Sequence, residues 1–501
     1  MPFTISRYFR LLTAVLCFSG GVYTHADAAT VAPEARPNIV FVFCDDLGYG
    51  EIQALNPERG KIATPSADKL ADQGLIFTDA HSGSSVCTPT RYGLLTGRYS
   101  WRTWLQGGVV KGFAPNLIAE DRPTVAGFLR DLGYHTAIIG KWHLNFQYFD
   151  PQTGETLRLA DYHSEGAPVG AVIPDGPTTR GFDYFHGFHH SRHMEKVIEN
   201  GRVIEKDAVV NMLPRLTRKA AEYIDQRAEL APEQPFFLYL PLNSPHTPIA
   251  PSKDWQGRSG MGDFADFVMQ TDAALGAVMD ALERNDMVEN TLVIFASDNG
   301  TSPRADFPAL EAQGHYSSAH FRGAKADIWD GGHRVPFIVR WPAAIQAGTT
   351  SDQLICLTDF FATVADLTGE AMPTDGGEDS VSFLPAFFGE PVATQRKGII
   401  HHSVSGRFAY RNDRWKLVLA RASGGWSDPR EGDARDAPEA QLYDMEADPS
   451  ETTNLYETRP EVAARLLREL ELYVHGGRST FGPASHNDFA PIDLWKSGRD
   501  Y

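Results

Sequence analysis

The stretch Pro37–Gly50, PNIVFVFCDDLGYG, indicates the fold of this chain. Ile39 to Phe43 form a run of apolar residues without a polar interruption. Such a run is typical of a strand that is buried on both faces, as in a parallel sheet covered by helices. The run ends abruptly in Asp45 and Asp46, so the expected strand leads directly into two carboxylates.

The same design recurs along the chain. Later apolar runs also end beside polar side chains, namely Lys141, His143, His246, Asp298 and Asn299. Helical patterns at 67–73, 124–132 and 264–285 lie between these runs, and one more buried strand is expected within 335–342. This alternation predicts an α/β fold with a large, mixed, mostly parallel sheet sandwiched by helices. Because ligands of such sheets bind at the carboxyl ends of the strands, we expect the polar side chains to share one crevice.

The pattern changes after residue 395. The segment 406–420, GRFAYRNDRWKLVLA, contains two short strand patterns around Asn412 and Asp413, which form a hairpin turn signal. A helical pattern follows from Pro460 to Val474. We therefore expect a catalytic domain at 29–395 and a smaller C-terminal α+β subdomain with an antiparallel sheet at 396–501.

Residues 1–28 have the pattern of a secretory signal peptide. They contain Arg7 and Arg10, a short apolar run and a small-residue cleavage site at Ala26 to Ala28. We therefore expect a protein that is exported to the periplasm or secreted. No later stretch reaches the roughly 18 apolar residues of a membrane span. The net charge of −18 repels polyanions, so nucleic acid is not an expected partner; the sequence leaves the oligomeric state open.

Three cysteines remain outside the expected signal peptide. Export permits a disulfide between Cys44 and Cys356, but Cys44 lies in an apolar strand, where a buried free thiol is common. Cys87 lies just ahead of the helix that Pro89 indicates, and Arg91 follows one turn later. The helix start and the arginine would stabilise a thiolate. From the residues alone, Cys87 is either a reactive cysteine or a buried structural one.

The strand-end carboxylates predict a metal site. Asp45, Asp46, Asp298 and the amide oxygen of Asn299 form a set of oxygen ligands. Several carboxylates in one crevice repel one another unless a cation is present. Oxygen ligands favour a hard ion, calcium or magnesium, and the exported location favours calcium.

The segment 87–98, CTPTRYGLLTGR, closely resembles the signature of the formylglycine-dependent sulfatases of the alkaline-phosphatase-like superfamily. The resemblance extends through NIVFVFCDDLGYG, GKWHL, SPHTP, ASDNG, FRGAKADIWDGGHRVP and QLYDMEADPSETTNL. It implies a sulfuric ester hydrolase with the fold of that superfamily and one Ca²⁺ ion. It also implies that a formylglycine-generating enzyme converts Cys87 to formylglycine (3-oxoalanine), which hydrates to a geminal diol held on calcium.

The resemblance further implies a role for each matching residue. The metal ligands would be Asp45, Asp46, Asp298, Asn299 and residue 87. The other catalytic residues would be Arg91 and His143 beside the diol, Lys141 and Lys325 on the sulfate oxygens, and His246 facing the leaving-group oxygen. The chain departs from the family pattern at Asp330, where glutamate is usual, and at His333, where an apolar residue is commoner.

Two histidine-rich segments suggest the substrate. The residues that we expect to line a substrate wall are His189, His190, Arg192, His193 and His320. Their irregular spacing disfavours a zinc site, while loop capping remains open for half of the histidines. A histidine and arginine wall suits a sulfated carbohydrate, such as a galactose-based polysaccharide like carrageenan or a galactosaminoglycan.

Other functions remain open at this stage. Within the superfamily, the chain could be a small-molecule arylsulfatase or a phosphonate or phosphate ester hydrolase. An inactive, glycan-binding sulfatase-like protein is a third alternative. That alternative is disfavoured because Cys87, Arg91 and every metal ligand are present.

Overall fold

The computed structural model describes residues 36–112, 114–157, 166–392 and 396–496, so the expected signal peptide lies outside the described residues. The strands are β1 (Asn38–Asp45), β2 (Leu75–Phe77), β3 (Ala80–His81), β4 (His135–Lys141), β5 (Tyr184–Phe188), β6 (Lys196–Glu199), β7 (Arg202–Lys206), β8 (Phe236–Pro245), β9 (Thr291–Ser297), β10 (Phe337–Arg340), β11 (Thr349–Ser351), β12 (Ile355–Cys356), β13 (Ile399–His402), β14 (Phe408–Arg411), β15 (Trp415–Val418) and β16 (Gln441–Asp444). The α-helices are α1 (Pro65–Asp72), α2 (Cys87–Thr96), α3 (Val125–Asp131), α4 (Met212–Leu230), α5 (Asp263–Arg284), α6 (Phe307–Glu311), α7 (Asp330–His333), α8 (Phe360–Thr368) and α9 (Pro460–His475).

A ten-stranded sheet forms the frame, with the order β11-β2-β10-β9-β1-β8-β4-β5-β6-β7. Its middle strands, from β9 to β5, are parallel, whereas β10, β6 and β7 are antiparallel to their neighbours. The expected large, mixed and mostly parallel sheet is confirmed. The strand expected within 335–342 runs antiparallel, because the short helix α7 already lies at the carboxyl edge and the chain must return from there.

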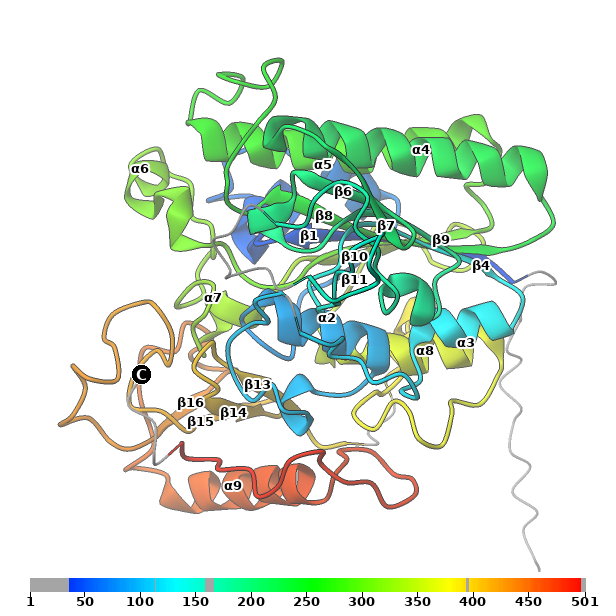
Figure 1. Cartoon of the computed structure of the whole chain (residues 1–501). Coiled ribbons are helices and arrows are strands. Elements are labelled where there is room, and N and C mark those ends of the chain that lie inside the picture. Colours follow the sequence, from blue (N-terminus) through cyan, green and yellow to red (C-terminus); the bar gives the residue numbers. More distant parts are fainter. Residues whose placement is uncertain (1–35, 113, 158–165, 393–395, 497–501) are drawn as a thin grey trace, which may run out of the picture.

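Helices cover both faces of this sheet (Figure 1). Helices α1, α4 and α5 pack on one face, and α2, α3 and α8 pack on the other. Strand β1 shows why both layers are needed. Val40 and Val42 belong to the core under the first layer, while Phe41 and Phe43 belong to the core under the second. Successive side chains of a strand point to opposite faces, so an uninterrupted apolar strand requires cover on both.

Three of the helices match the patterns at 67–73, 124–132 and 264–285, namely α1, α3 and α5. Thr124 caps α3, since its side chain accepts a hydrogen bond from the amide of Gly127 at 3.0 Å. The expectations above do not include α4 and α8. Helix α4 is amphipathic and α8 is mostly apolar, and each buries its apolar side chains against the sheet that it covers.

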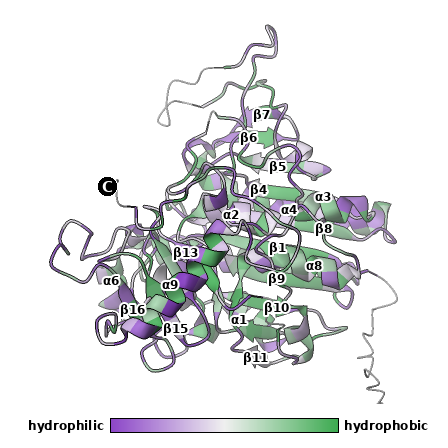
Figure 2. Ribbon diagram, turned by 90° about the horizontal axis from the view of Figure 1, so that it is seen from below, coloured by the Kyte–Doolittle hydropathy of each residue, from purple (hydrophilic) through white to green (hydrophobic). Residues whose placement is uncertain are grey.

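A smaller antiparallel sheet, β13-β14-β15-β16, follows and packs against α9. The hairpin expected around Asn412 and Asp413 joins β14 to β15, and the C-terminal α+β architecture is confirmed. Helix α9 buries Ala463, Leu466 and Leu470, whose spacing of three to four residues forms one apolar stripe. Figure 2 shows this mixture of polar and apolar residues on α9 and the hydrophobic character of the central strands β1, β8 and β9.

The cysteines of the described residues, Cys44, Cys87 and Cys356, are all free and buried. Cys356 lies on β12, which pairs with β3 in a separate two-stranded sheet. No helix within the described ranges is both long enough and apolar enough to cross a membrane.

Candidate active site

Neighbouring strands of the main sheet end in polar side chains at one edge. Asp45 is the last residue of β1, and Lys141 is the last residue of β4. The chain leaves β9 through Asp298 and Asn299, and it leaves β8 through His246. Because β9, β1, β8 and β4 are consecutive in the sheet, their carboxyl ends meet (Figure 1).

The side chains of this edge form two groups that share Asp45. Single ligand atoms of Asp45, Cys87 and Asp298 lie within 4.8 Å of one another, and so do those of Asp45, Asp46 and His246. Asp46 has a left-handed backbone with φ of 64°, and its amide donates to Oδ1 of Asp298 at 3.1 Å. Aspartate adopts this conformation more readily than a bulky residue. The turn thus places two consecutive carboxylates in the crevice.

Buried cations face the carboxylates. Nζ of Lys141 lies 2.9 and 2.7 Å from the two carboxylate oxygens of Asp45. Nη2 of Arg91 lies 2.7 Å from Oδ2 of Asp298 and 3.4 Å from Oδ1 of Asp45. Nζ of Lys325 contacts Oδ1 of Asp46. Each carboxylate therefore has a cationic partner.

Burial and charge act in opposite directions on these carboxylates. Burial disfavours the charged form of Asp45, but Lys141, His246 and Arg91 together outweigh it and hold the pKa of Asp45 well below its ordinary value. Burial dominates at Asp298 and, with the nearby charge of Asp45, raises the pKa of Asp298 to about 7 despite Arg91. A further cation in the crevice would favour the ionised form of Asp298.

The donor set fits a metal ion. Within the described part of the chain, Oδ2 of Asp46 and Oδ1 of Asn299 are buried without a hydrogen-bond partner. The Nδ2 amide of Asn299 donates to Oδ1 of Asp46 at 2.8 Å. A buried oxygen without a partner is costly, and a bound cation would remove that cost. Carboxylate and amide oxygens are the ligands that hard cations prefer.

Cys87 is the first residue of α2, one position further into the helix than the sequence indicates. Val86 precedes the helix in an extended conformation. The Cys87 side chain is buried, and Sγ lies 3.2 Å from Nδ1 of His143. Burial raises the pKa of the Cys87 thiol, even though Lys141 and Lys325 oppose the shift. The thiol is therefore protonated at neutral pH and is not an activated thiolate.

Two histidines complete the crevice. Nε2 of His143 donates to the carbonyl of Val110 at 3.2 Å, so Nδ1 carries the lone pair that faces the Cys87 thiol. Nδ1 of His246 donates to the carbonyl of Thr247 at 2.5 Å, which leaves Nε2 free to carry or deliver a proton 3.6 Å from Asp46. The side chain of His246 is 18% exposed, whereas that of Lys141 is fully buried, so His246 lies nearer to the solvent side.

Three of the expected substrate-wall histidines form a buried row behind His143. The ring centroids of His143 and His190 are 5.7 Å apart, those of His189 and His190 are 4.8 Å apart, and those of His190 and His193 are 4.5 Å apart. All three side chains are buried. Burial lowers the pKa of His189 to about 3. The row therefore lies inside the protein, where it supports His143.

The other two wall residues are exposed. Arg192 lies in the same segment as the histidine row. His320 lines a separate cavity of about 640 Å³ together with Arg334 and Arg411. None of the candidate catalytic residues lines that cavity. The structure thus places Arg192 near the histidine row and His320 on another surface.

Sequence reasoning missed the residues that hold His143. Thr88 Oγ1 donates to the carbonyl of His143 at 3.1 Å and accepts from the amide of Val110 at 3.3 Å. Thr88 follows Cys87 directly, so its place in the CTPTR motif was the available signal. Val110 contributes only main-chain atoms, for which a sequence carries no signal.

Comparison with known proteins agrees with this geometry. A family model described as Sulfatase matches residues 37–370, and one described as N-sulphoglucosamine sulphohydrolase, C-terminal, matches residues 324–474. An N-acetylgalactosamine-6-O-sulfatase of Bacteroides thetaiotaomicron is 30% identical over 492 residues, which cover 87% of this chain and 93% of that protein. Arylsulfatase A of Bos taurus is 30% identical over 502 residues, and the match covers 92% of this chain and 92% of that protein.

A solved structure from Bacteroides thetaiotaomicron, described under the metabolism of multiple glycosaminoglycans, has the same fold. It superimposes with a TM-score of 0.75 at 28% identity, and the match covers 87% of this chain and 98% of that one. The Sulfatase model spans the strand-end residues, the Cys87 helix and Lys325 alike. This chain belongs to the sulfatase family, whose members hydrolyse sulfate esters.

Proposed function

We propose that the protein removes sulfate from a sulfated carbohydrate after Cys87 has been converted to formylglycine. The observation that carries this proposal is the setting of Cys87, a buried thiol whose Sγ lies within 4.8 Å of carboxylate oxygens of Asp45 and Asp298, and whose pKa is raised by burial. A protonated thiol is a poor nucleophile, and sulfur is a poor ligand for a hard cation. An oxygen-bearing side chain at position 87 would remove both conflicts.

Calcium is the ion that we propose for this crevice. The residues that would hold it are Asp45, Asp46, Asp298, Asn299 and residue 87, with sulfur of the unmodified Cys87 standing in for oxygens of the hydrated aldehyde. When bound, calcium would neutralise the substrate sulfate and favour ionisation of a hydroxyl on residue 87. The unpaired oxygens of Asp46 and Asn299 support this assignment.

The fixed cations of the crevice would bind and stabilise the sulfate. Lys141 and Lys325 would contact the sulfate oxygens, and Arg91 would hold the side chain of residue 87. All three are already fixed by buried carboxylates, so they need little reorganisation when negative charge develops in the transition state. Lysine and arginine donors in a dry site are well suited to this role.

His143 and His246 would accept a hydrogen bond and donate a proton, respectively. Nδ1 of His143 faces residue 87 and can accept a hydrogen bond from it. Burial lowers the pKa of His246, but an anionic sulfate beside Nε2 would favour the protonated ring. His246 would then donate this proton to the leaving sugar oxygen.

The proposed substrates are sulfated galactose- or N-acetylgalactosamine-containing glycans. The relative from Bacteroides thetaiotaomicron named an N-acetylgalactosamine-6-O-sulfatase supports this choice, since the match spans nearly all of both chains. We also propose that residues 1–28 direct export to the periplasm or the outside, and that a formylglycine-generating enzyme matures the chain. Residues 29–395 would form the catalytic domain and 396–501 the C-terminal subdomain.

The test combines a mass measurement with a substrate panel. The Cys87 peptide should carry an aldehyde when the chain is expressed with a converting enzyme. The converted protein should release sulfate from a defined 6-O-sulfated galactosamine or galactose oligosaccharide faster than it releases phosphate from a phosphate ester. Full activity of a chain with an unmodified thiol, or faster turnover of the phosphate ester, would contradict the proposal.

A further inference from the structure

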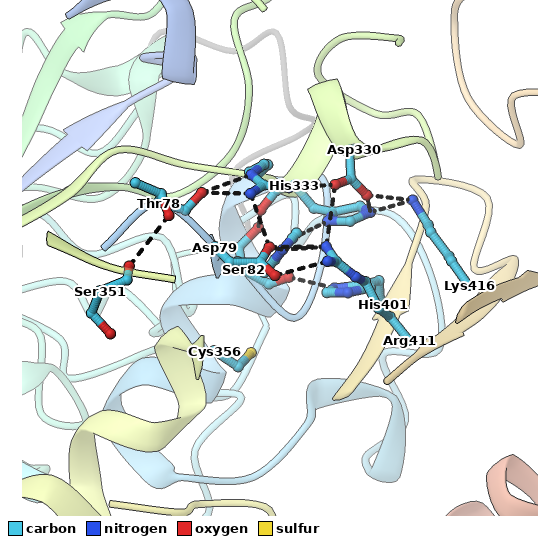
Figure 3. Close-up of polar contacts among 12 residues, drawn as sticks. Thr78, Asp79, Ser82, Asp330, His333, Ser351, Cys356, His401, Arg411 and Lys416 are labelled. Carbon is cyan, nitrogen blue, oxygen red and sulfur yellow. Dashed lines mark hydrogen bonds and ion pairs between the residues drawn. The ribbon is translucent and has the colours of Figure 1, made fainter. Parts of the chain in front are cut away.

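A second buried polar cluster joins the segment 82–86, which leads into Cys87, to the C-terminal sheet. Its centre is formed by His81 on β3, His333 on α7 and His401 on β13, and none of these side chains is exposed to solvent. Figure 3 labels His333 and His401 together with their charged neighbours Asp330, Arg411 and Lys416. His333 is one of the two departures from the family pattern, and Oδ1 of the other departure, Asp330, lies 3.7 Å from its Nε2.

The three rings contact one another directly. His333 and His401 stack with a centroid distance of 3.8 Å and an interplanar angle of 11°. Nδ1 of His81 lies 3.0 Å from Nδ1 of His333, and Nε2 of His81 lies 2.7 Å from Oδ1 of Asp79. Nζ of Lys416 lies 3.0 Å from Nε2 of His333.

Two sets of proton positions each satisfy part of these contacts. Lysine can only donate, so Nε2 of His333 accepts from Lys416, and its Nδ1 donates to Nδ1 of His81. Nε2 of His81 then donates to Asp79, although the donor Nη1 of Arg411 lies 3.0 Å from the same nitrogen. The carbonyl of Ile328, 3.1 Å from Nε2 of His333, would require the opposite tautomer. With that tautomer, Nδ1 of His333 would accept from Nδ1 of His81, and Nε2 of His81 would accept from Arg411. Both arrangements keep one hydrogen bond between the two rings.

The cluster does not have the geometry of a metal site. The lone pairs of imidazole lie in the ring plane, so two rings stacked at 3.8 Å cannot both direct a lone pair at one ion. Lys416 and Arg411 also lie 3.0 Å from ring nitrogens of His333 and His81, where they would repel a cation. The stack instead fixes the orientation of the His401 ring.

His401 holds the main chain that leads to Cys87. Its Nδ1 donates to the carbonyl of Ser82 at 2.9 Å. The amide of Ser82 donates to the carbonyl of His333 at 2.8 Å, so both main-chain groups of Ser82 are held by the cluster. The segment 82–86 then runs directly into Cys87 at the start of α2.

The same segment is tied to Lys325. The amide of Ser85 donates to the carbonyl of His402 at 3.1 Å, and the carbonyl of Ser85 accepts from the amide of Ala326 at 2.9 Å. Strand β13 therefore supports residue 87 through the segment 82–86 and supports the neighbour of Lys325 through Ser85. Two groups of the crevice depend on the position of one strand of the C-terminal sheet.

We infer that His401, oriented by its stack on His333, is a positioning residue that fixes the segment 82–86 and thereby the side chain of residue 87. Its catalytic consequence rests on the proposed function, but its structural consequence does not. Loss of the His401–Ser82 hydrogen bond should loosen the start of α2 while the main sheet stays intact.

The first test measures the accessibility of Cys87 in protein expressed without a converting enzyme. Iodoacetamide labelling is followed at each cysteine by peptide mass for the wild type, His401→Leu and His401→Asn. An asparagine amide can take the place of Nδ1 and donate to Ser82. We expect Cys87 to react about tenfold faster in His401→Leu because local opening is easier, and within about twofold of the wild type in His401→Asn. Cys44 on β1 serves as the internal reference and should not change.

The second test measures turnover per aldehyde-bearing molecule in converted protein. A misplaced reacting group lowers kcat, so His401→Leu should lose about tenfold in kcat with KM within about twofold, and His401→Asn should recover most of it. The control is His135→Leu, which removes a histidine bonded to Tyr223 at the opposite end of β4. It should leave kcat unchanged.

Equal labelling of Cys87 in His401→Leu and the wild type would overturn the inference. Equal acceleration at Cys44 would also overturn it, because the effect would then be general unfolding. A stoichiometric transition metal that is lost in His401→Leu would show a metal site in its place. If the converted wild type released no sulfate from any sulfated sugar, the proposed function would fail, and the labelling result would still decide the role of His401.

Discussion

Nζ of Lys141 lies within 2.9 Å of both carboxylate oxygens of Asp45, and neither side chain is exposed. The pair connects the ends of β4 and β1, two strands that both adjoin β8. A buried charge that loses its partner is strongly destabilising, so this pair links the stability of the crevice to its chemistry.

Replacement of Lys141 by methionine should therefore lower stability and activity together. We expect the free energy of unfolding to fall by about 3–5 kcal/mol, because the charge of Asp45 stays buried without its closest partner. The value of kcat/KM should fall by about 10²–10³, because the cation that we propose to bind the sulfate is lost. Denaturant unfolding and sulfate release measure the two effects. The double variant Lys141→Met/Asp45→Asn should regain stability but not activity; recovery of both would contradict the assignment of Lys141.

Chelation should remove activity and lower the melting temperature, and calcium should restore both. A ligand present at 100 times its Kd stabilises the folded state by about 2.7 kcal/mol. Asn299→Ala should lose most of this calcium-dependent stabilisation, since Oδ1 of Asn299 is one of the unpaired oxygens. The matched control, Asn290→Ala, changes the residue that directly precedes β9, at the end of the strand opposite to Asn299, and should respond to calcium like the wild type. Melting curves with chelator and with added calcium make the comparison.

Replacement of His246 by alanine should discriminate between leaving groups. A sugar hydroxyl needs a proton as it leaves, whereas an activated phenol does not. We expect kcat for a sulfated sugar to fall by about 10²–10⁴ and kcat for nitrophenyl sulfate to fall far less. Steady-state kinetics on both substrates test this. Equal losses on the two substrates would assign His246 to binding of the sulfate and not to protonation of the leaving group.

The residues of the crevice could be predicted because the topology gathers them. An apolar run that ends in Asp45 predicts a buried strand with a carboxylate at its end, and parallel strands place such ends together. The apolar runs therefore predict the parallel strands of the main sheet from local sequence alone. The antiparallel direction of β10 depends on where α7 lies in space, which no local pattern contains.

The histidine-rich segment shows where sequence reasoning stops. His190 and Arg192 are two residues apart, yet one packs against His143 and the other faces solvent. Exposure at these positions depends on the packing of the segment after β5 and not on its composition. The partners of His333 could not be predicted from nearby sequence either, because His401 and Lys416 come from the C-terminal sheet.

The buried carboxylate of Asp79 should make stability depend on pH. Burial opposes its charge, but Arg411, Arg334 and His81 outweigh burial and lower the pKa of Asp79. A carboxylate with a lowered pKa contributes stability above its ordinary pKa, and this contribution is lost as the pH falls through the folded-state value. Asp79→Asn should therefore cost about 3 kcal/mol at pH 7, and the difference from the wild type should shrink as acid is added below the ordinary carboxyl range. Urea unfolding across this pH range measures the difference in the free energy of unfolding between the wild type and Asp79→Asn. The control is Asp254→Asn, which changes an exposed carboxylate. A difference that grew in acid would contradict the prediction.

Arg192 and His190 should respond differently to replacement, although they lie in the same segment. Arg192 is exposed, so Arg192→Ala should raise KM for a sulfated oligosaccharide by about tenfold, equivalent to about 1.4 kcal/mol, and spare nitrophenyl sulfate. His190 is buried beside His143, so His190→Ala should lower stability by about 2 kcal/mol and reduce turnover of both substrates alike. Kinetics on the two substrates and melting curves for both variants separate the two roles. If His190→Ala weakened only the oligosaccharide, His190 would contact the glycan; if Arg192→Ala lost both activities equally, Arg192 would support the catalytic residues.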